Sequence, residues 1–305
     1  MLKTTLAMTE DDLMPEVRQA MWGMRCSGTL CDGLVKMDDG GEFTVHKAIM
    51  ASCSEYFRAL FGCSKSKAAR SDVLVPGVLK QTMAIIMEFA HKRIAWVRCD
   101  NVESLLAAAD YLCVMAIIKH CCDFIVSIMT PENCISIHNI AKLYNCSDLS
   151  TTAYNYLMQN FIEVSERSEE VLHLEVDEVE AMMLDENLNV IKEETVWKAV
   201  IRWIDFDRDN RKQYISRLFK CVRTGLVDTD FFVEKVKARK YVAEDEACKT
   251  LRFVYDLDIM VNHEELPTPL FARQRIPYEM MFVMGGWMGA EPTAFVETYE
   301  TKADR

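Results

Sequence analysis

The stretch from Cys31 to Gly62 constrains the fold of this chain more than any other segment. It starts with an apolar pair, Leu34 and Val35, passes through Asp-Asp-Gly-Gly at 38–41 and continues into Phe43-Thr-Val45. Aspartate and glycine tolerate the positive φ of a tight turn, so the pattern predicts a β-hairpin. A helical stretch ending near Phe61 follows, in which Ser52 and Ser54 can cap the next helical turn.

The surrounding segments extend this hairpin into an α+β unit over residues 15–130, preceded by a tail at 1–14. Met14 to Met24 predicts an opening helix with Pro15 tolerated in its first turn. A short strand at 72–75 and helices at 79–90, from 101, and over 117–128 complete the pattern, which Thr130-Pro131 ends.

The rest of the chain changes character twice. Residues 131–262 have helical periodicity throughout, as in Val196, Val200 and Trp203, and predict stacked helical hairpins. Pro267 and Pro269 mark a linker at 263–276. Residues 277–305 predict one strand that ends in a tight turn at Gly285-Gly286 and a second strand at 295–299.

Composition limits the classes of function. The net charge is −12 and the pI about 5.1, which disfavours nucleic acid and anionic membranes as partners. Of this charge, −10 lies between Glu163 and Glu194, where we expect solvated helix faces. No signal peptide or membrane span is predicted, and the 12 cysteines include no CxxC pair. We expect reduced, mostly structural thiols, for example Cys113, Cys121 and Cys134, in a cytoplasmic or nuclear protein.

Catalytic and cofactor readings find little support. Asp32 and His46 could form an acid–base pair, but His46 lacks the neighbouring ligands that a zinc site needs. No nucleophile elbow or phosphate-binding glycine loop occurs. Trp197, Trp203 and Tyr111 are expected to be core or interface residues. The sequence therefore predicts no enzyme, no cofactor and no metal.

The order of strand, hairpin, His46-Lys47, helix and Ser54-x-Tyr-Phe-Arg resembles the start of a BTB (POZ) domain. Further on, Asn133-Cys134, Asn160-Phe161, Glu193-Glu194 and 200–203 resemble a BACK domain, and Gly285-Gly286-Trp287 resembles the start of a kelch blade. This order is similar to that of the kelch-like family. The resemblance implies an α+β BTB domain at 15–130, an all-α BACK domain at 131–262, and part of a first kelch repeat at 277–305.

The family resemblance also implies a function. Kelch-like proteins are usually substrate adaptors of cullin-3 RING ubiquitin ligases, which dimerise through the BTB domain and select a substrate with a propeller. By position, the dimer interface would use Met14, Val17, Met21 and Met24, and Asp32 and His46 would be structural framework residues. The cullin-binding residues would be Phe61, Ser64, Lys65, Ser66, Tyr111, Leu112 and Cys113, extended by 135–144.

Two features depart from the family pattern. A propeller typically needs 4–8 blades of about 50 residues, and at most part of one is present. The segment 62–70 is basic, where many cullin-binding relatives place an acid. An alternative therefore stays open: a BTB–BACK protein without ligase duty that dimerises with itself or with other kelch-like proteins and modulates them. The substrate protein cannot be named from the sequence.

Overall fold

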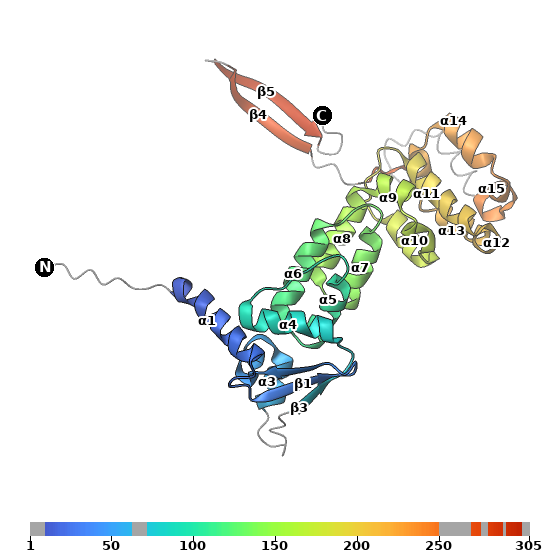
Figure 1. Ribbon diagram of the computed structural model, residues 1–305. Coiled ribbons are helices and arrows are strands. Elements are labelled where there is room, and N and C mark those ends of the chain that lie inside the picture. Colours follow the sequence, from blue (N-terminus) through green and yellow to red (C-terminus); the bar gives the residue numbers. More distant parts are fainter. Residues whose placement is uncertain (1–9, 63–71, 250–269, 276–279, 289–290, 301–305) are drawn as a thin grey trace. The chain divides into compact units, whose positions relative to one another are not determined.

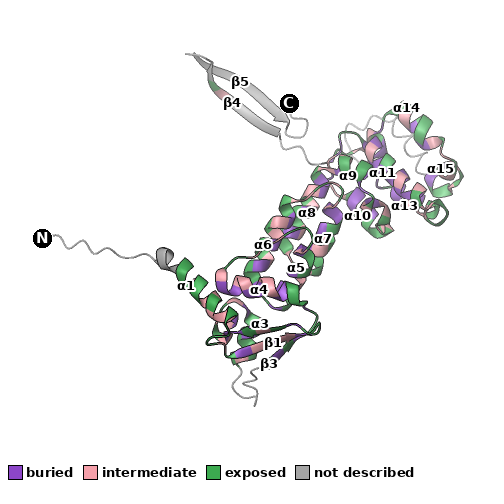
Figure 2. Ribbon diagram, viewed as in Figure 1, coloured by how far each residue is buried: buried purple, intermediate pink, exposed green. Residues whose placement is uncertain are grey.

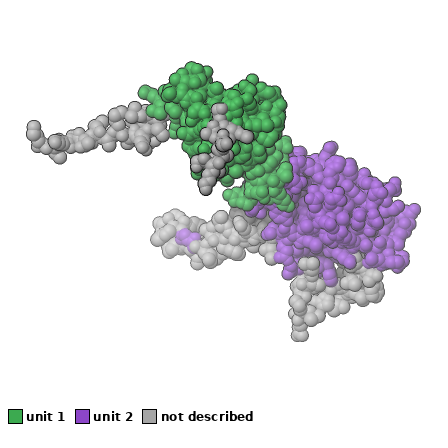
Figure 3. All heavy atoms as spheres, turned by 90° about the horizontal axis from the view of Figure 1, so that it is seen from below, with its two compact units in different colours: residues 1–129, 140–150 green, residues 130–139, 151–305 purple. Residues whose placement is uncertain are grey.

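The computed structural model describes residues 10–62, 72–249, 270–275, 280–288 and 291–300 (Figure 1). The chain divides into two compact units, which Figure 3 colours separately. Unit 1 comprises 1–129 and 140–150, and unit 2 comprises 130–139 and 151–305. The predicted linker prolines, Pro267 and Pro269, lie outside the described residues.

Unit 1 contains a three-stranded mixed sheet in the order β2-β1-β3. The strands are β1 (Gly33–Met37), β2 (Glu42–Val45) and β3 (Asp72–Val75). β1 pairs antiparallel with β2 and parallel with β3, so the predicted hairpin is confirmed. Gly40 adopts a φ of 78° in the hairpin turn, a conformation that favours glycine.

The hairpin turn also holds the start of a later helix, α4 (Lys80–Lys92). The two carboxylate oxygens of Asp39 accept hydrogen bonds from the backbone N–H of Gly41 (3.0 Å) and of Lys80 (2.7 Å). These N–H groups lower the pKa of Asp39, since they stabilise its ionised form. Asp38 accepts from the N–H of Gly77. The Asp-Asp-Gly-Gly turn therefore fixes the connection between β3 and α4.

Six helices in the described residues up to 127 complete this part of unit 1, and the sheet lies at one end of it (Figure 1). They are α1 (Glu10–Cys26), α2 (Lys47–Cys53), α3 (Glu55–Gly62), α4 (Lys80–Lys92), α5 (Val102–Tyr111) and α6 (Met115–Ser127). α1 begins before the predicted Met14, which places Pro15 inside the helix and not in its first turn. Ser54 separates α2 from α3, and its Oγ accepts from the N–H of Phe57 as predicted for a cap. The core includes Phe57, Met83, Ile86, Leu105 and Leu106.

Unit 2 is helical throughout its described residues up to 249, as the periodicity predicts. Its longer helices are α7 (Cys134–Leu143), α8 (Ser147–Gln159), α9 (Phe161–Arg167), α10 (Val176–Leu184) and α11 (Glu193–Phe206). The last residues of α7 and the first residues of α8 are assigned to unit 1. Shorter turns follow: α12 (Arg208–Arg211), η2 (Lys212–Tyr214), α13 (Ile215–Phe219), η3 (Thr224–Leu226), α14 (Thr229–Phe231), the π-helix η4 (Phe232–Lys237), α15 (Lys240–Glu244) and η5 (Leu270–Ala272).

The core of unit 2 lies along α11, as the alternation of buried and exposed residues in Figure 2 shows. Trp197 and Trp203 are buried there, and the Trp203 indole N–H donates to the carbonyl of Leu174. η1 (Glu170–His173) also contacts α11. The sequence predicts that Trp197 and Trp203 are core or interface residues, and their burial shows that they are core residues.

The C-terminal strands form a two-stranded antiparallel ribbon, β4 (Met280–Met288) and β5 (Glu291–Glu300). Both predicted strands exist. The predicted turn at Gly285-Gly286 is wrong, because both glycines lie inside β4 at a register shift between Met284 and Gly286. Their φ values of 72° and 138° explain why glycine occupies this bulge.

Candidate functional site

The sequence-predicted residues Phe61 and Tyr111 are brought together through an aromatic cluster. Phe61 stacks on the buried Phe57 with ring centroids 5.6 Å apart. Tyr56 contacts both Phe57 (5.3 Å) and Tyr111 (5.4 Å). These ring contacts connect α3 to the end of α5, even though the residues are about 50 positions apart in the sequence.

The polar ends of this cluster are also connected. Burial, and a hydrogen bond between Tyr56 and Tyr111, raise the pKa of Tyr56 to about 12. The Tyr56 phenol therefore stays neutral at physiological pH and can offer a hydrogen bond to a partner. The ammonium of Lys47 lies 5.7 Å from the centre of the Phe61 ring.

The loop after α5 turns sharply beside this cluster. Leu112 is fully buried, so its side chain is a core residue and cannot contact a partner. Its carbonyl accepts a hydrogen bond of 2.5 Å from the Ser54 hydroxyl, which ties the loop to the start of α3. Cys113 has a φ of 51° and is exposed, so the prediction that it is a structural thiol on an apolar helix face is wrong.

Tyr111 and Met115 carry the exposed apolar area here, with 44% and 68% of their surface accessible. We call Tyr56, Phe61, Tyr111, Cys113 and Met115 the aromatic face. Sequence reasoning missed Tyr56 and Met115. Met115 is a large apolar residue at the first position of α6, and no capping side chain precedes it. This pattern could have indicated an exposed apolar side chain.

A cavity of about 590 Å³ adjoins the aromatic face within unit 1. Cys113, Met115, Ile118 and Cys122 line one side, and residues 144–149 line the other. Burial, with a hydrogen bond to Cys146, raises the pKa of Cys122 to about 12, so its thiol is protonated and behaves as an apolar group. Of the predicted extension at 135–144, Tyr144 lines the cavity, whereas Ile135 is buried in unit 2.

The remaining predicted cullin-binding residues, Ser64, Lys65 and Ser66, lie outside the described residues. The framework residues have structural contacts. Asp32 Oδ1 accepts from the N–H of Lys47 (2.8 Å) at the start of α2, and His46 is buried.

The predicted dimer residues lie on α1. Val17 is 53% exposed, and Met21 and Met24 are half-buried. The side chain of Met14 is not among those that the structure describes. On another side of the helix Trp22 packs against His91 of α4, with ring centroids 5.8 Å apart. The helix thus packs on unit 1 with one side and leaves Val17 exposed.

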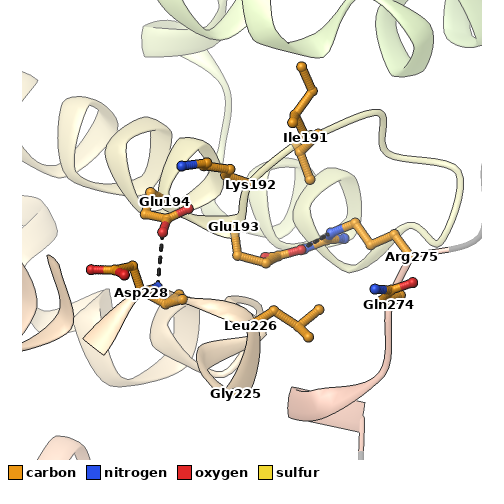
Figure 4. A pocket seen from close by; sticks show the side chains of 11 residues that line it. Ile191, Lys192, Glu193, Glu194, Gly225, Leu226, Asp228, Gln274 and Arg275 are labelled. Carbon is orange, nitrogen blue, oxygen red and sulfur yellow. Dashed lines mark hydrogen bonds and ion pairs between the residues drawn. The ribbon is translucent and has the colours of Figure 1, made fainter. Parts of the chain in front are cut away.

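A second cavity, of about 750 Å³, lies in unit 2 between residues 190–194, 225–228 and the segment at Gln274-Arg275 (Figure 4). Arg275 and Glu193 form an ion pair whose side chains are each 3% exposed, and Nε lies 2.6 Å from Oε1. Glu194 Oε1 accepts from the N–H of Asp228 (2.9 Å). Gly225 packs closely on η5, since a Cβ there would lie 3.1 Å from Ala272.

Other kinds of site find no support in the described part of the chain. No group of three or more His, Cys, Asp or Glu residues there could hold a metal ion. No described helix is long and apolar enough to cross a membrane. Every cysteine that the structure describes is a free thiol.

Comparison with known families identifies two domains. The BTB/POZ domain model matches residues 21–129, and the model "BACK: BTB And C-terminal Kelch" matches residues 134–237. The predicted fold class, an α+β BTB domain followed by an all-α BACK domain, is confirmed.

Several curated kelch-like proteins match most of this chain. Human kelch-like protein 17 is 36% identical over 232 residues, which is 76% of this chain and 36% of that protein. Human kelch-like protein 28 is 32% identical over 85% of this chain and 46% of its own length. Human kelch-like protein 2 is 30% identical over 96% of this chain and 50% of its own length. The chain therefore spans between a third and a half of these relatives.

One solved structure that matches is the BTB domain of zebrafish PATZ1, with 26% identity over 39% of this chain and 96% of that chain, and a TM-score of 0.35. Within the kelch-like proteins, the runs at 105–110, 121–122 and 275–287 resemble kelch-like protein 10, and that nearer assignment stays a prediction.

Proposed function

Because this chain belongs to the kelch-like family of BTB–BACK proteins, we propose that it is a non-catalytic adaptor or scaffold subunit of a cullin-3 RING ubiquitin ligase. The observation that carries the proposal is the aromatic face beside the 590 Å³ cavity. Exposed aromatic and methionine side chains at the mouth of a hollow are typical of protein-binding sites. The face also contains Phe61 and Tyr111, which the family resemblance places at the cullin contact.

The proposed contact has two parts. Tyr111 and Met115 would pack against an apolar surface of cullin-3, while the cavity would accept a short chain segment. Its lining combines apolar side chains with Asp110, Lys119 and Asp123. Dimerisation would use the exposed side of α1, either with a second copy or with another kelch-like protein.

Calorimetric titration of the full chain with the N-terminal domain of cullin-3 tests this proposal. Tyr111→Ala and Met115→Ala should each weaken binding by roughly fivefold or more, since central apolar contacts at interfaces contribute about 1–2 kcal/mol or more. Val126→Ala is the matched control. Val126 is also exposed on α6, but 11 residues from Met115, which is about 16 Å along the helix.

A second variant tests the basic segment. Lys65→Glu restores an acid near the position that many relatives use, and one charge-assisted hydrogen bond is worth roughly 1.5–3 kcal/mol. Affinity should therefore rise about tenfold or more. Equal affinities for Lys65→Glu and the parent would show that this segment is not at the interface.

If neither the parent nor Lys65→Glu binds cullin-3, the ligase proposal is wrong. Co-purification with a full-length kelch-like protein would then support the alternative, in which the chain acts as a dimerisation partner of its relatives.

A further inference from the structure

Two buried histidines, His46 and His91, face each other beneath α1. His46 Nδ1 lies 3.2 Å from His91 Nε2, which is a hydrogen-bond distance. His46 precedes α2, and His91 lies in the last turn of α4. Both residues belong to unit 1, and both are more than nine-tenths buried.

The outer nitrogens of the two rings have defined partners. His46 Nε2 lies 3.0 Å from the carbonyl oxygen of Thr29, and His91 Nδ1 lies 2.9 Å from the carbonyl oxygen of Met87. A carbonyl oxygen can only accept a hydrogen bond, so each of these ring nitrogens must carry a hydrogen.

A neutral imidazole has one N–H, so two neutral rings would use their hydrogens on the carbonyls. His46 Nδ1 and His91 Nε2 would then face each other as two lone pairs at 3.2 Å. A third proton between the facing nitrogens removes this conflict, because it converts two opposed acceptors into a charge-assisted hydrogen bond.

We propose that the His46–His91 pair is a buried proton-binding site that holds one extra proton at neutral pH. The proton resides on His46, whose ring then donates both to Thr29 and to His91. His91 stays neutral and accepts. This assignment agrees with the lowered pKa of His91: burial, the neighbouring His46 and Arg25 all lower it, and together they outweigh the hydrogen bond to the Met87 carbonyl, which raises it.

The surroundings of the pair bear on its charge. Arg25 reaches toward it from α1, and its guanidinium lies over Trp22 and Phe43. The thiol of Cys31 lies 3.7 Å from His46 Nε2. Lys47 follows His46 in α2, and on α4 Lys92 is paired with Glu88 (2.9 Å). The carbonyl of Thr29 and the ring of His91 are the groups that stabilise the added charge on His46.

The proton affects the packing of α1, because the Trp22 ring lies edge-on to His91. Loss of the proton forces one ring to abandon its carbonyl or to move from its neighbour. We therefore expect the docking of α1 to weaken as the pair deprotonates at alkaline pH.

The sign of the stability effect follows from counting protons. Unfolded histidines titrate near about pH 6.5, so above about pH 7.5 the unfolded chain holds almost none on these two rings. The folded pair still holds one, so the folding equilibrium constant falls by up to about tenfold per pH unit as the pH rises. Below about pH 6 the unfolded rings bind two protons and the folded pair one, so stability falls again.

Nitrogen-15 NMR of the histidine-labelled full chain tests the proton directly at pH 7.5. We expect both nitrogens of His46 to be protonated, and only Nδ1 of His91. One protonated nitrogen on each ring would overturn the proposal.

A stability measurement gives a second, independent test. His91→Gln places an amide opposite His46 that can donate to Nδ1, so this variant needs no extra proton. Hydrogen exchange of α5 peptides in urea reports the stability of unit 1 at pH 7.0 and 8.5. The parent should be less stable at pH 8.5 than at pH 7.0, whereas His91→Gln should not show this loss of stability. His120→Gln, on the exposed side of α6, should behave like the parent. An equal pH dependence in all three chains would also overturn the proposal.

Discussion

Arg275 should be among the most costly residues in unit 2 to replace. Its guanidinium is bidentate to Glu193, with contacts of 2.6 and 3.2 Å, and it also donates to the carbonyls of Met183, Asp185 and Cys221. Replacement by methionine keeps the volume roughly constant but leaves the buried carboxylate and three carbonyls without this donor. Removal of one partner of a buried ion pair costs about 3–5 kcal/mol.

This loss can be converted into a melting temperature. For a domain of 150–250 residues, each kcal/mol corresponds to roughly 2–4 °C. We therefore expect Arg275→Met to lower the unit 2 transition by roughly 6–20 °C in scanning calorimetry of the full chain. Hydrogen exchange of α11 would identify that transition as the one that moves.

Two further variants separate the buried charge from general damage. The double variant Glu193→Gln with Arg275→Met should recover much of the loss, because no unpaired charge stays buried. Arg273→Met is the matched control: Arg273 pairs with Glu186 on the surface, and such pairs contribute about 0.2–1 kcal/mol. If Arg275→Met costs no more than Arg273→Met, the reasoning about this ion pair is refuted.

Two other predictions concern the ends of the chain. The double variant Val17→Glu with Met21→Glu, or deletion of residues 1–24, should yield monomer or aggregate, because the exposed side of α1 is the proposed dimer interface. If light scattering shows that the intact parent is a stable monomer, this prediction is wrong. Removal of 276–305 should leave the melting temperature nearly unchanged, because a two-stranded ribbon contributes little stability by itself. Removal of 270–305 should lower it as far as Arg275→Met does, and equal melting temperatures for the two truncations would show that Arg275 is not an anchor.

Local chemistry made part of the fold predictable. The hairpin at 38–41, the strand at 72–75 and the Ser54 cap depend on residues within a few positions of one another, and the structure contains all three. The family resemblance, which depends on the order of such motifs, added the domain organisation.

The remaining features depend on contacts between distant positions. Arg275 falls in a segment predicted to be a linker, and nothing in its neighbourhood signals that it pairs with a glutamate 82 positions earlier. His46 and His91 are 45 positions apart and carry no ligand spacing. Gly285-Gly286 looked like a turn because glycine permits both a turn and a bulge, and only the strand register distinguishes them.

The division of unit 1 has a practical consequence for anyone who wishes to produce it as a fragment. A clone that stops at Met129, where the BTB match ends, omits residues 140–150 of the same unit. Residues 144–149 form one wall of the 590 Å³ cavity, so such a clone would present Ile118 and Cys122 to solvent and invite aggregation. A negative binding result with that clone would say nothing about the intact chain. The shortest clone that retains all of unit 1, and with it the whole cavity, extends to Ser150.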